Sequence, residues 1–272
     1  MSRIQEILAK ADRDGTAGLL HPPVGLGGGA AATASIAVPM TVAAPLPPGP
    51  FAMPAAVEPR TVQARLHRAL IAAIAPHSSV AEQYRAIRGK LSQREESGGL
   101  RSLAVTSPAR GDGKSITAAN LALTMAQEVQ RSVVLVDADL RNPSLHSLFA
   151  IDRQPGLSDV LAGEASLDEA LVYMPELRLM LLPAGRTPDY PTEMLGSAAM
   201  RDAIDSLSAR FDRLVLDLPA ALPLADVGTV TPLVDGVVMV VRAGVTQRPV
   251  LDQALSTFEQ SKVVGMVLND TE

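Results

Sequence analysis

Apolar runs and helical stripes alternate along the chain from about residue 79 onward. Runs of consecutive apolar residues are typical of strands buried on both faces of a parallel sheet. We expect such strands at residues 103–106, 133–136, 179–182, 214–216, 237–241 and 263–268. Helical periodicity lies between them, near residues 157–161, 167–171, 193–211, 224–233 and 249–259. This alternation predicts an α/β fold with a mostly parallel sheet, helices on both faces, and ligands at the carboxyl ends of the strands.

One helix is expected ahead of the first strand, from about residue 79 to residue 95. Its apolar stripe consists of Val80, Tyr84, Ile87 and Leu91. Ser79 and Glu82 have the spacing of a capping box, which favours a helix start at this point. Glu82, Arg85 and Arg88 are three residues apart, so they lie along an adjoining face where they can pair with one another.

The region before this helix falls into three segments that differ in composition. Residues 1–11 fit one short amphipathic helix, with Ile4, Ile7 and Leu8 on one face. So short a helix is marginal by itself, and a frayed terminus and a docking segment that folds on a partner both remain open. Residues 12–60 are rich in Ala, Pro and Gly without periodicity, which predicts a disordered linker. A short helix is expected within residues 61–75, and we assign residues 61–272 to one folded domain.

Composition limits the domain size, the partners and the cellular compartment that can be expected for this protein. The chain has 272 residues, 47% of them hydrophobic, which is enough for one sizeable α/β domain with additional segments. A net charge of −5 argues against nucleic acid as a partner. The absence of cysteine excludes disulfides and thiolate metal sites and fits a reducing cytoplasm. Residues 19–57 carry no charge, but Pro and Gly interrupt them, so neither a membrane span nor a signal peptide is expected.

The stretch between the first strand and the next helix has the composition of a phosphate-binding loop. Gly111 and Gly113 lack Cβ atoms, so their backbone N–H groups can close around an anion, and the following helix points its positive end at the same place. Lys114 can then reach the β- and γ-phosphates of a nucleotide, while the Ser115 hydroxyl binds Mg²⁺. The predicted nucleotide-binding residues of this loop are Gly111, Asp112, Gly113, Lys114, Ser115 and Ile116.

Acidic residues end two of the apolar runs. Asp137 and Asp139 lie in VVLVDADLR, and Asp217 lies in RLVLDLPA. The ends of parallel strands meet at one edge of a sheet, and in P-loop enzymes an Asp there orients Mg²⁺ and helps to position the attacking group. For Asp139 an alternative remains open, a local ion pair with Arg141 at the mouth of the loop. The predicted catalytic residues are Lys114, Asp137, Asp139 and Asp217, and the predicted Mg²⁺ ligands are Ser115, Asp139 and Asp217.

From about residue 79 to residue 269 the chain resembles the catalytic domain of the bacterial tyrosine kinases of capsule and exopolysaccharide synthesis. GDGKS resembles the Walker A motif of that family, VLVDADLR its Walker A′ motif and LVLDLP its Walker B motif. The segments RNPSLHSLF, GLSDVLAGE, LLPAGRTPDYPTEML, DGVVMVV and GMVLN follow in the family's order. The resemblance implies a P-loop NTPase fold, phosphoryl transfer from ATP, and ATP with Mg²⁺ as cofactors. It also implies that Asn269 approaches the adenine.

The same resemblance offers a second interpretation of the helix at residues 79–95. EQYRAIR matches the family's oligomerisation motif, here Glu82, Arg85 and Arg88. Members of the family assemble head to tail into rings, so a ring-type homo-oligomer is an alternative to pairing within the helix. The sequence contains no membrane-spanning activator segment. This suggests that a separate membrane polysaccharide co-polymerase activates the protein and recruits it to the inner face of the cell membrane.

The sequence departs from the family pattern at three places. Pro108, Ala109 and Arg110 replace the usual residues at the start of the loop. Leu218 and Ala220 replace a polar residue and a proline after the Walker B acid, so weaker coupling to the phosphate is expected. Only residues 270–272 follow the last expected strand, and none is a tyrosine. Little or no autophosphorylation of a C-terminal tail is therefore expected.

Two other functions remain open. MinD/ParA-like positioning ATPases share the fold and the acids, but they carry an extra lysine at the position of Ala109 and use a terminal membrane helix or a basic surface that this sequence lacks. A non-catalytic adaptor that uses bound nucleotide as an assembly switch is the second alternative. This alternative stays open because the sequence lacks the C-terminal tyrosine cluster that such kinases autophosphorylate, and because the surroundings of the Walker B acid are altered.

Overall fold

Seven strands form one sheet in the computed structural model of this protein, which describes residues 66–129, 131–223 and 225–269. The strand order is β3-β4-β2-β5-β1-β6-β7, and all neighbours run parallel except β3 and β4. The strands are β1 (Ser102–Thr106), β2 (Val133–Asp137), β3 (Val172–Met174), β4 (Leu179–Leu182), β5 (Arg213–Asp217), β6 (Gly236–Arg242) and β7 (Val263–Asn269). The predicted α/β fold with a mostly parallel sheet is confirmed. The helix expected at residues 1–11 and the linker at 12–60 lie outside the described residues.

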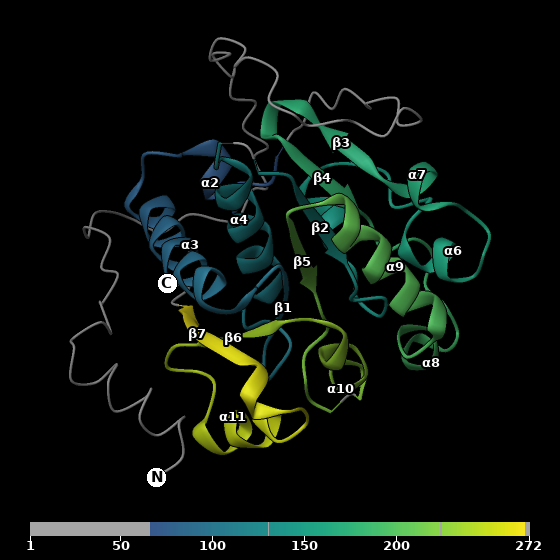
Figure 1. The fold of residues 1–272 in the computed structure, drawn as a ribbon. Helices are drawn as coiled ribbons and strands as arrows, with labels where there is room; N and C mark the ends of the chain where they lie inside the picture. Colours follow the sequence, from purple (N-terminus) through teal and green to yellow (C-terminus); the bar gives the residue numbers. More distant parts are fainter. Residues whose placement is uncertain (1–65, 130, 224, 270–272) are drawn as a thin grey trace, which may run out of the picture.

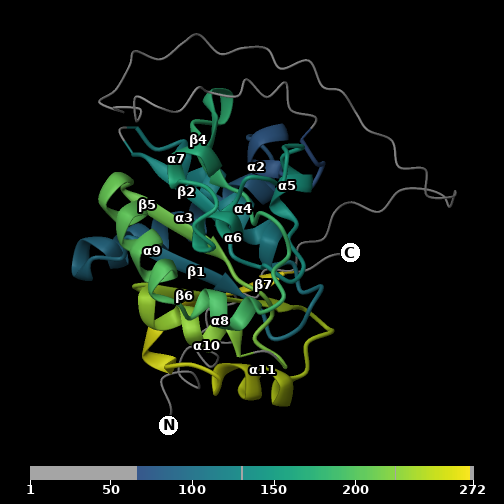
Figure 2. The ribbon, with the colours of Figure 1, turned by 90° about the vertical axis from the view of Figure 1, so that its right-hand side faces the viewer.

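Helices cover both faces of the sheet (Figure 1). One face carries α2 (Ile71–Ile74), α3 (Ser79–Gly98), α4 (Lys114–Ala126) and α5 (Leu145–Leu148). The other face, toward which Figure 2 is turned, carries α6 (Leu157–Leu161), α7 (Leu167–Ala170), α8 (Pro191–Leu195), α9 (Ala198–Arg210), α10 (Asp226–Val230) and α11 (Arg248–Leu255). Short 3₁₀ turns lie at Pro175–Leu177, Thr231–Leu233 and Gln260–Lys262. Every residue of β1, β2 and β5 is buried, which explains the apolar runs inside these strands.

The core on the face that carries α2 to α5 is centred on α4, whose residues from Thr117 to Ala126 are all buried. This helix packs against the sheet on one side and against α2 and α3 on the other. Its alanines allow that close approach, because they need little room between the layers. The start of α4 is thereby held rigidly at the end of β1, where the phosphate loop was predicted.

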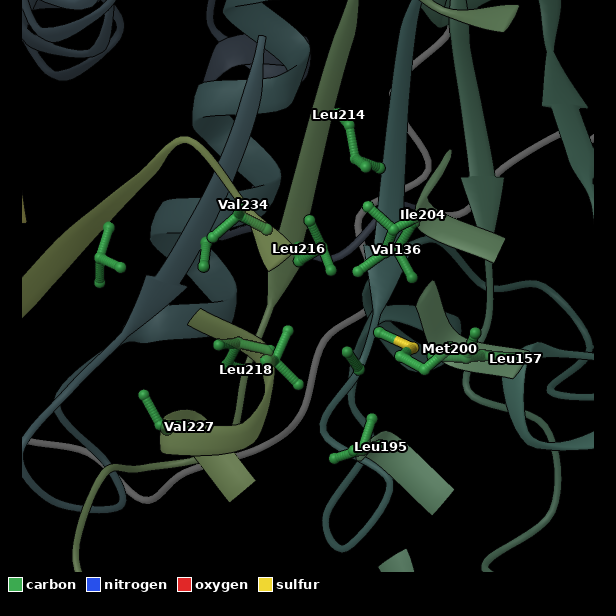
Figure 3. Packing of buried hydrophobic residues seen from close by; sticks show 14 of the residues in the cluster. Val136, Leu157, Leu195, Met200, Ile204, Leu214, Leu216, Leu218, Val227 and Val234 are labelled. Carbon is green, nitrogen blue, oxygen red and sulfur yellow. The ribbon is translucent and has the colours of Figure 1, made fainter. Parts of the chain in front are cut away.

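The second core lies on the opposite face of the sheet. Val136 and Leu216, from neighbouring strands, belong to one buried cluster with Met200 and Ile204 of α9 (Figure 3). Leu218, which follows β5, is fully buried in the same cluster. The apolar residue after the Walker B acid therefore contributes to packing.

Three local differences from the sequence prediction have physical causes. The helix expected at residues 193–211 is divided into α8 and α9, because Ser197 Oγ caps α9 by accepting a hydrogen bond from Met200 N (3.2 Å). The strand β3 was missed, since three residues become a strand only through antiparallel pairing with β4. Of the helix expected within residues 61–75, only α2 is helical among the described residues. Nowhere in the described ranges is a helix long and apolar enough to cross a membrane.

Candidate functional site

The predicted phosphate loop connects β1 to α4 at the carboxyl edge of the sheet. Gly111 and Gly113 have φ values of 91° and 96°, in the left-handed region that glycine adopts without steric cost. Gly113 directly precedes the first residue of α4, Lys114. The backbone therefore has the turn that a strand–loop–helix anion site needs, as the sequence predicted from these glycines.

Lys114 is buried among carboxylates that lie at the ends of two neighbouring strands, β2 and β5. Its Nζ donates a hydrogen bond to Asp139 Oδ2 at 2.7 Å and lies 3.5 Å from Asp217 Oδ1. It also lies 3.1 Å from Ser115 Oγ. The loop, the end of β2 and the end of β5 thus bring four of the predicted residues together.

The electrostatics of this cluster are dominated by burial and by its own charges. Burial opposes the ammonium charge, but the carboxylates of Asp217 and Asp139 outweigh it and raise the pKa of Lys114 above its usual value. Burial also raises the pKa of Asp217, although Lys114 partly offsets the effect. Several acids around one ammonium leave an excess of negative charge that a cation can neutralise.

Asp137 lies beside Asp217 in the parallel register of β2 and β5. Its Oδ2 accepts hydrogen bonds from the backbone N–H groups of Ser144 (3.1 Å) and Leu145 (3.0 Å), so this carboxylate also holds the start of α5. Burial and the charge of Asp217 raise the pKa of Asp137 to about 7. Within the described part of the chain, no group donates a hydrogen bond to Asp137 Oδ1 or Asp217 Oδ2.

The remaining residues predicted for nucleotide binding differ in their surroundings. Asp112 is buried at the back of the loop, and its backbone oxygen accepts a hydrogen bond from Asn269 Nδ2 at 2.9 Å. Asn269, at the end of β7, therefore lies next to the loop. Its expected approach to the adenine stays a prediction. Ile116 is half-buried and packs against the core on the α4 side of the sheet.

The alternative ion pair between Asp139 and Arg141 is wrong. Arg141 instead pairs with Asp226, through Nε (2.6 Å) and Nη2 (3.2 Å), and it donates a further hydrogen bond to Thr192 Oγ1 (2.9 Å). Asp139 is free to pair with Lys114 because Arg141 points to this other acid. Sequence analysis missed this pair because Asp226 lies 85 residues from Arg141 in the sequence.

The residues predicted for oligomerisation lie on α3, away from the acid cluster. Glu82 pairs with Arg85, which also donates to the backbone oxygen of Pro76. Arg88 does not join this pair, because it lies 3.2 Å from Glu128 and donates to the oxygen of Thr124 at 2.6 Å. The pairing expected within the helix is thus correct for Glu82 and Arg85 and wrong for Arg88, which connects α3 to the end of α4.

The parallel sheet and the glycine loop between β1 and α4 together identify the P-loop ATPase fold. A ParA family ATPase from Chlorobium tepidum, 22% identical, shares this fold with a TM-score of 0.52 over 62% of this chain and 74% of that chain. The kinase domain of the Escherichia coli tyrosine kinase ETK is 26% identical, with a TM-score of 0.71 over 74% of this chain and 80% of that chain. None of the known protein-family models matches the chain.

Sequence relatives decide the family. Tyrosine-protein kinase YwqD of Bacillus subtilis is 35% identical over 208 residues, which is 75% of this chain and 87% of YwqD. The succinoglycan biosynthesis transport protein ExoP of Rhizobium meliloti is 34% identical over 203 residues, and the match spans only 26% of ExoP. The chain belongs to the bacterial tyrosine kinase family, as the sequence motifs implied.

Proposed function

We propose that this protein binds ATP with Mg²⁺ and transfers its terminal phosphoryl group in the regulation of exopolysaccharide or capsule synthesis. The observation that carries the proposal is the position of Lys114, which begins α4 after the glycine loop and lies within 3.5 Å of Asp139 and Asp217. A lysine and two acids at this edge of a parallel sheet are the groups that phosphoryl transfer requires.

The donor set supports Mg²⁺ as the metal. Ser115, Asp139 and Asp217 supply hard oxygen ligands, which Mg²⁺ prefers. Asp217 Oδ2 and Asp137 Oδ1 are buried without a hydrogen-bond donor among the described residues, so both retain an acceptor for a cation or its water. Mg²⁺ would neutralise phosphate charge during transfer, Lys114 and the N-terminus of α4 would hold the phosphates, and Asp137 or Asp139 would position the attacking group.

The proposed kinase and its alternatives differ in the acceptor to which the phosphoryl group is transferred. Leu218 and Ala220, after the Walker B acid, are buried and apolar, so they provide no side chain that could relay a proton. This favours slow intrinsic turnover and dependence on a partner, and it keeps the nucleotide-switch adaptor as the second candidate. The MinD/ParA-like function has only the shared fold in its favour.

The partner we propose is a separate membrane protein of polysaccharide export. One relative is named a biosynthesis transport protein, and one similar structure is a chimerical protein, CapA2B2, which matches 75% of this chain with a TM-score of 0.70. Recruitment by such a partner would place this protein at the inner face of the cell membrane. Ring assembly through Glu82, Arg85 and Arg88 is part of the same proposal.

The test measures nucleotide binding first and chemistry second. Calorimetry of the full chain with ATP should show binding that is lost when EDTA removes Mg²⁺. Phosphate release and phosphotyrosine formation are then followed with labelled ATP, with and without a candidate membrane partner, and with Asp217→Asn as the inactive control. Binding without turnover under both conditions would favour the adaptor, and absence of binding would refute the proposal.

A further inference from the structure

The phosphate loop contains an acid, Asp112, whose side chain accepts hydrogen bonds from within the loop and from a distant segment. Asp112 is buried, and both of its carboxylate oxygens accept hydrogen bonds. Oδ2 accepts from the backbone N–H of Ala109 at 2.9 Å, which closes the loop on itself. Oδ1 accepts from the hydroxyl of Thr246 at 3.1 Å, which connects the loop to a segment 134 residues away.

Thr246 lies in the turn that follows β6, and its hydroxyl has two partners. While the hydroxyl donates to Asp112, its oxygen accepts a hydrogen bond from Arg242 N at 3.1 Å. Arg242 is the last residue of β6. A single side chain therefore links the carboxyl end of a sheet strand to the phosphate loop.

A second contact comes from the neighbouring strand. Asn269, the last residue of β7, donates from Nδ2 to the backbone oxygen of Asp112 (2.9 Å), while its own backbone oxygen accepts from Ala243 N (2.8 Å). A Cβ atom on Gly113 would lie 2.1 Å from Asn269 Nδ2, so the amide fills the space that the missing side chain leaves. Residues of the β6–β7 edge therefore hold Asp112 through both its side chain and its backbone oxygen.

We propose that Thr246 is a positioning residue for nucleotide binding, and that together with Asn269 it holds the phosphate loop in its binding conformation. A loop with two left-handed glycines has many accessible conformations, and ordering it costs conformational entropy when a ligand binds. A contact that orders the loop in advance removes part of that cost. The functional part of this inference rests on the proposed function, whereas the effect on loop order does not.

Hydrogen exchange of the nucleotide-free full chain tests loop order directly. Thr246→Val removes the hydroxyl at nearly constant volume, and Thr246→Ser retains it. Thr257→Val makes the same change at a hydroxyl that donates to Ala254 O. Loss of the hydrogen bond to Asp112 should speed exchange of the amides from residue 109 to residue 114 by about fivefold in Thr246→Val. Thr246→Ser and Thr257→Val should match the wild type. Equal exchange in Thr246→Val and Thr257→Val would overturn the inference.

ATP affinity, measured by calorimetry, tests the consequence of that order. Thr246→Val should bind ATP about fivefold more weakly and Thr246→Ser as tightly as the wild type. Faster exchange with unchanged ATP affinity would overturn the positioning role. If the wild type binds no ATP while Thr246→Val still speeds exchange, the loop contact stands and the proposed function fails.

Discussion

Lys114 Nζ lies 2.7 Å from Asp139 Oδ2, although the two residues are 25 positions apart in the sequence. The contact joins the first residue of α4 to the acid that follows β2. Phosphate oxygens would compete with this carboxylate for the same ammonium. Binding of a nucleotide at the loop is therefore coupled to the charge state of the acid cluster.

Replacement of Lys114 by methionine should abolish ATP binding, because this ammonium is the buried positive side chain at the start of α4. Loss of a charge-assisted contact of about 3 kcal/mol corresponds to an affinity loss of about 100-fold. Calorimetry with ATP and Mg²⁺ measures it, with Lys90→Met, a change at an exposed lysine of α3, as the control. Unchanged ATP affinity in folded Lys114→Met would refute the assignment of the phosphate loop.

The pKa of Asp137 predicts a defined dependence of stability on pH. Because burial raises this pKa from 3.8 to about 7, the folded state binds a proton more tightly than the unfolded state. The group's contribution to stability is fully present below about pH 4 and is lost as pH rises through about 7. Wild type should therefore lose stability relative to Asp137→Asn across this window, by up to about 1.4 kcal/mol per pKa unit.

Urea unfolding in EDTA at several pH values measures this difference. Asp202→Asn, at an exposed position on α9, should run parallel to the wild type at all pH values. A constant difference in the free energy of unfolding between wild type and Asp137→Asn from pH 4 to pH 8 would contradict the raised pKa.

The pair of Arg141 and Asp226 should contribute measurable stability, because the Asp226 carboxylate is fully buried and bound by two guanidinium nitrogens. A double-mutant cycle with alanine at both positions should give a coupling energy of about 1–3 kcal/mol in urea unfolding. The exposed pair Arg248 and Asp252, 4.0 Å apart on α11, is the matched control and should couple by less than about 0.5 kcal/mol. Equal coupling in both pairs would contradict the prediction.

Self-association should depend on the arginines of α3. Replacing Arg85 and Arg88 with alanine should lower the mass measured by light scattering, whereas Lys90→Ala on the same helix should not. The variant also loses the contact of Arg88 with Glu128, so its melting temperature has to be compared with that of the wild type. A wild type that is monomeric at high concentration with nucleotide bound would refute ring assembly by this chain alone.

The tyrosines differ in their access to a kinase site. Tyr84 is half-buried on α3, where burial raises the pKa of its hydroxyl, whereas Tyr190 is 71% exposed at the start of α8. After incubation with labelled ATP, peptide mapping should find no phosphate on Tyr84, and any phosphotyrosine of this chain should lie at a more accessible residue such as Tyr190. Phosphate on Tyr84 in the folded protein would show that α3 opens away from α4.

The sequence alone determined the features that local chemistry specifies. Each of β1, β2 and β5 contains a run of consecutive apolar residues, so the sequence predicted these strands, and glycines with Lys114 identified the loop. The same patterns placed Asp137, Asp139 and Asp217 at strand ends. Each of these features is specified by residues that are close together in the sequence, within a single strand or turn.

Only the tertiary structure decided which of these groups meet. Arg141 pairs with Asp226 instead of Asp139. Arg88 pairs with Glu128, beyond the end of α4, instead of with a residue of its own helix. The Asp112 carboxylate accepts a hydrogen bond from Thr246. These partners are brought together by the strand order, in which β1 lies between β5 and β6. That order results from burying both faces of the sheet at once, a property of the whole chain that no local pattern encodes.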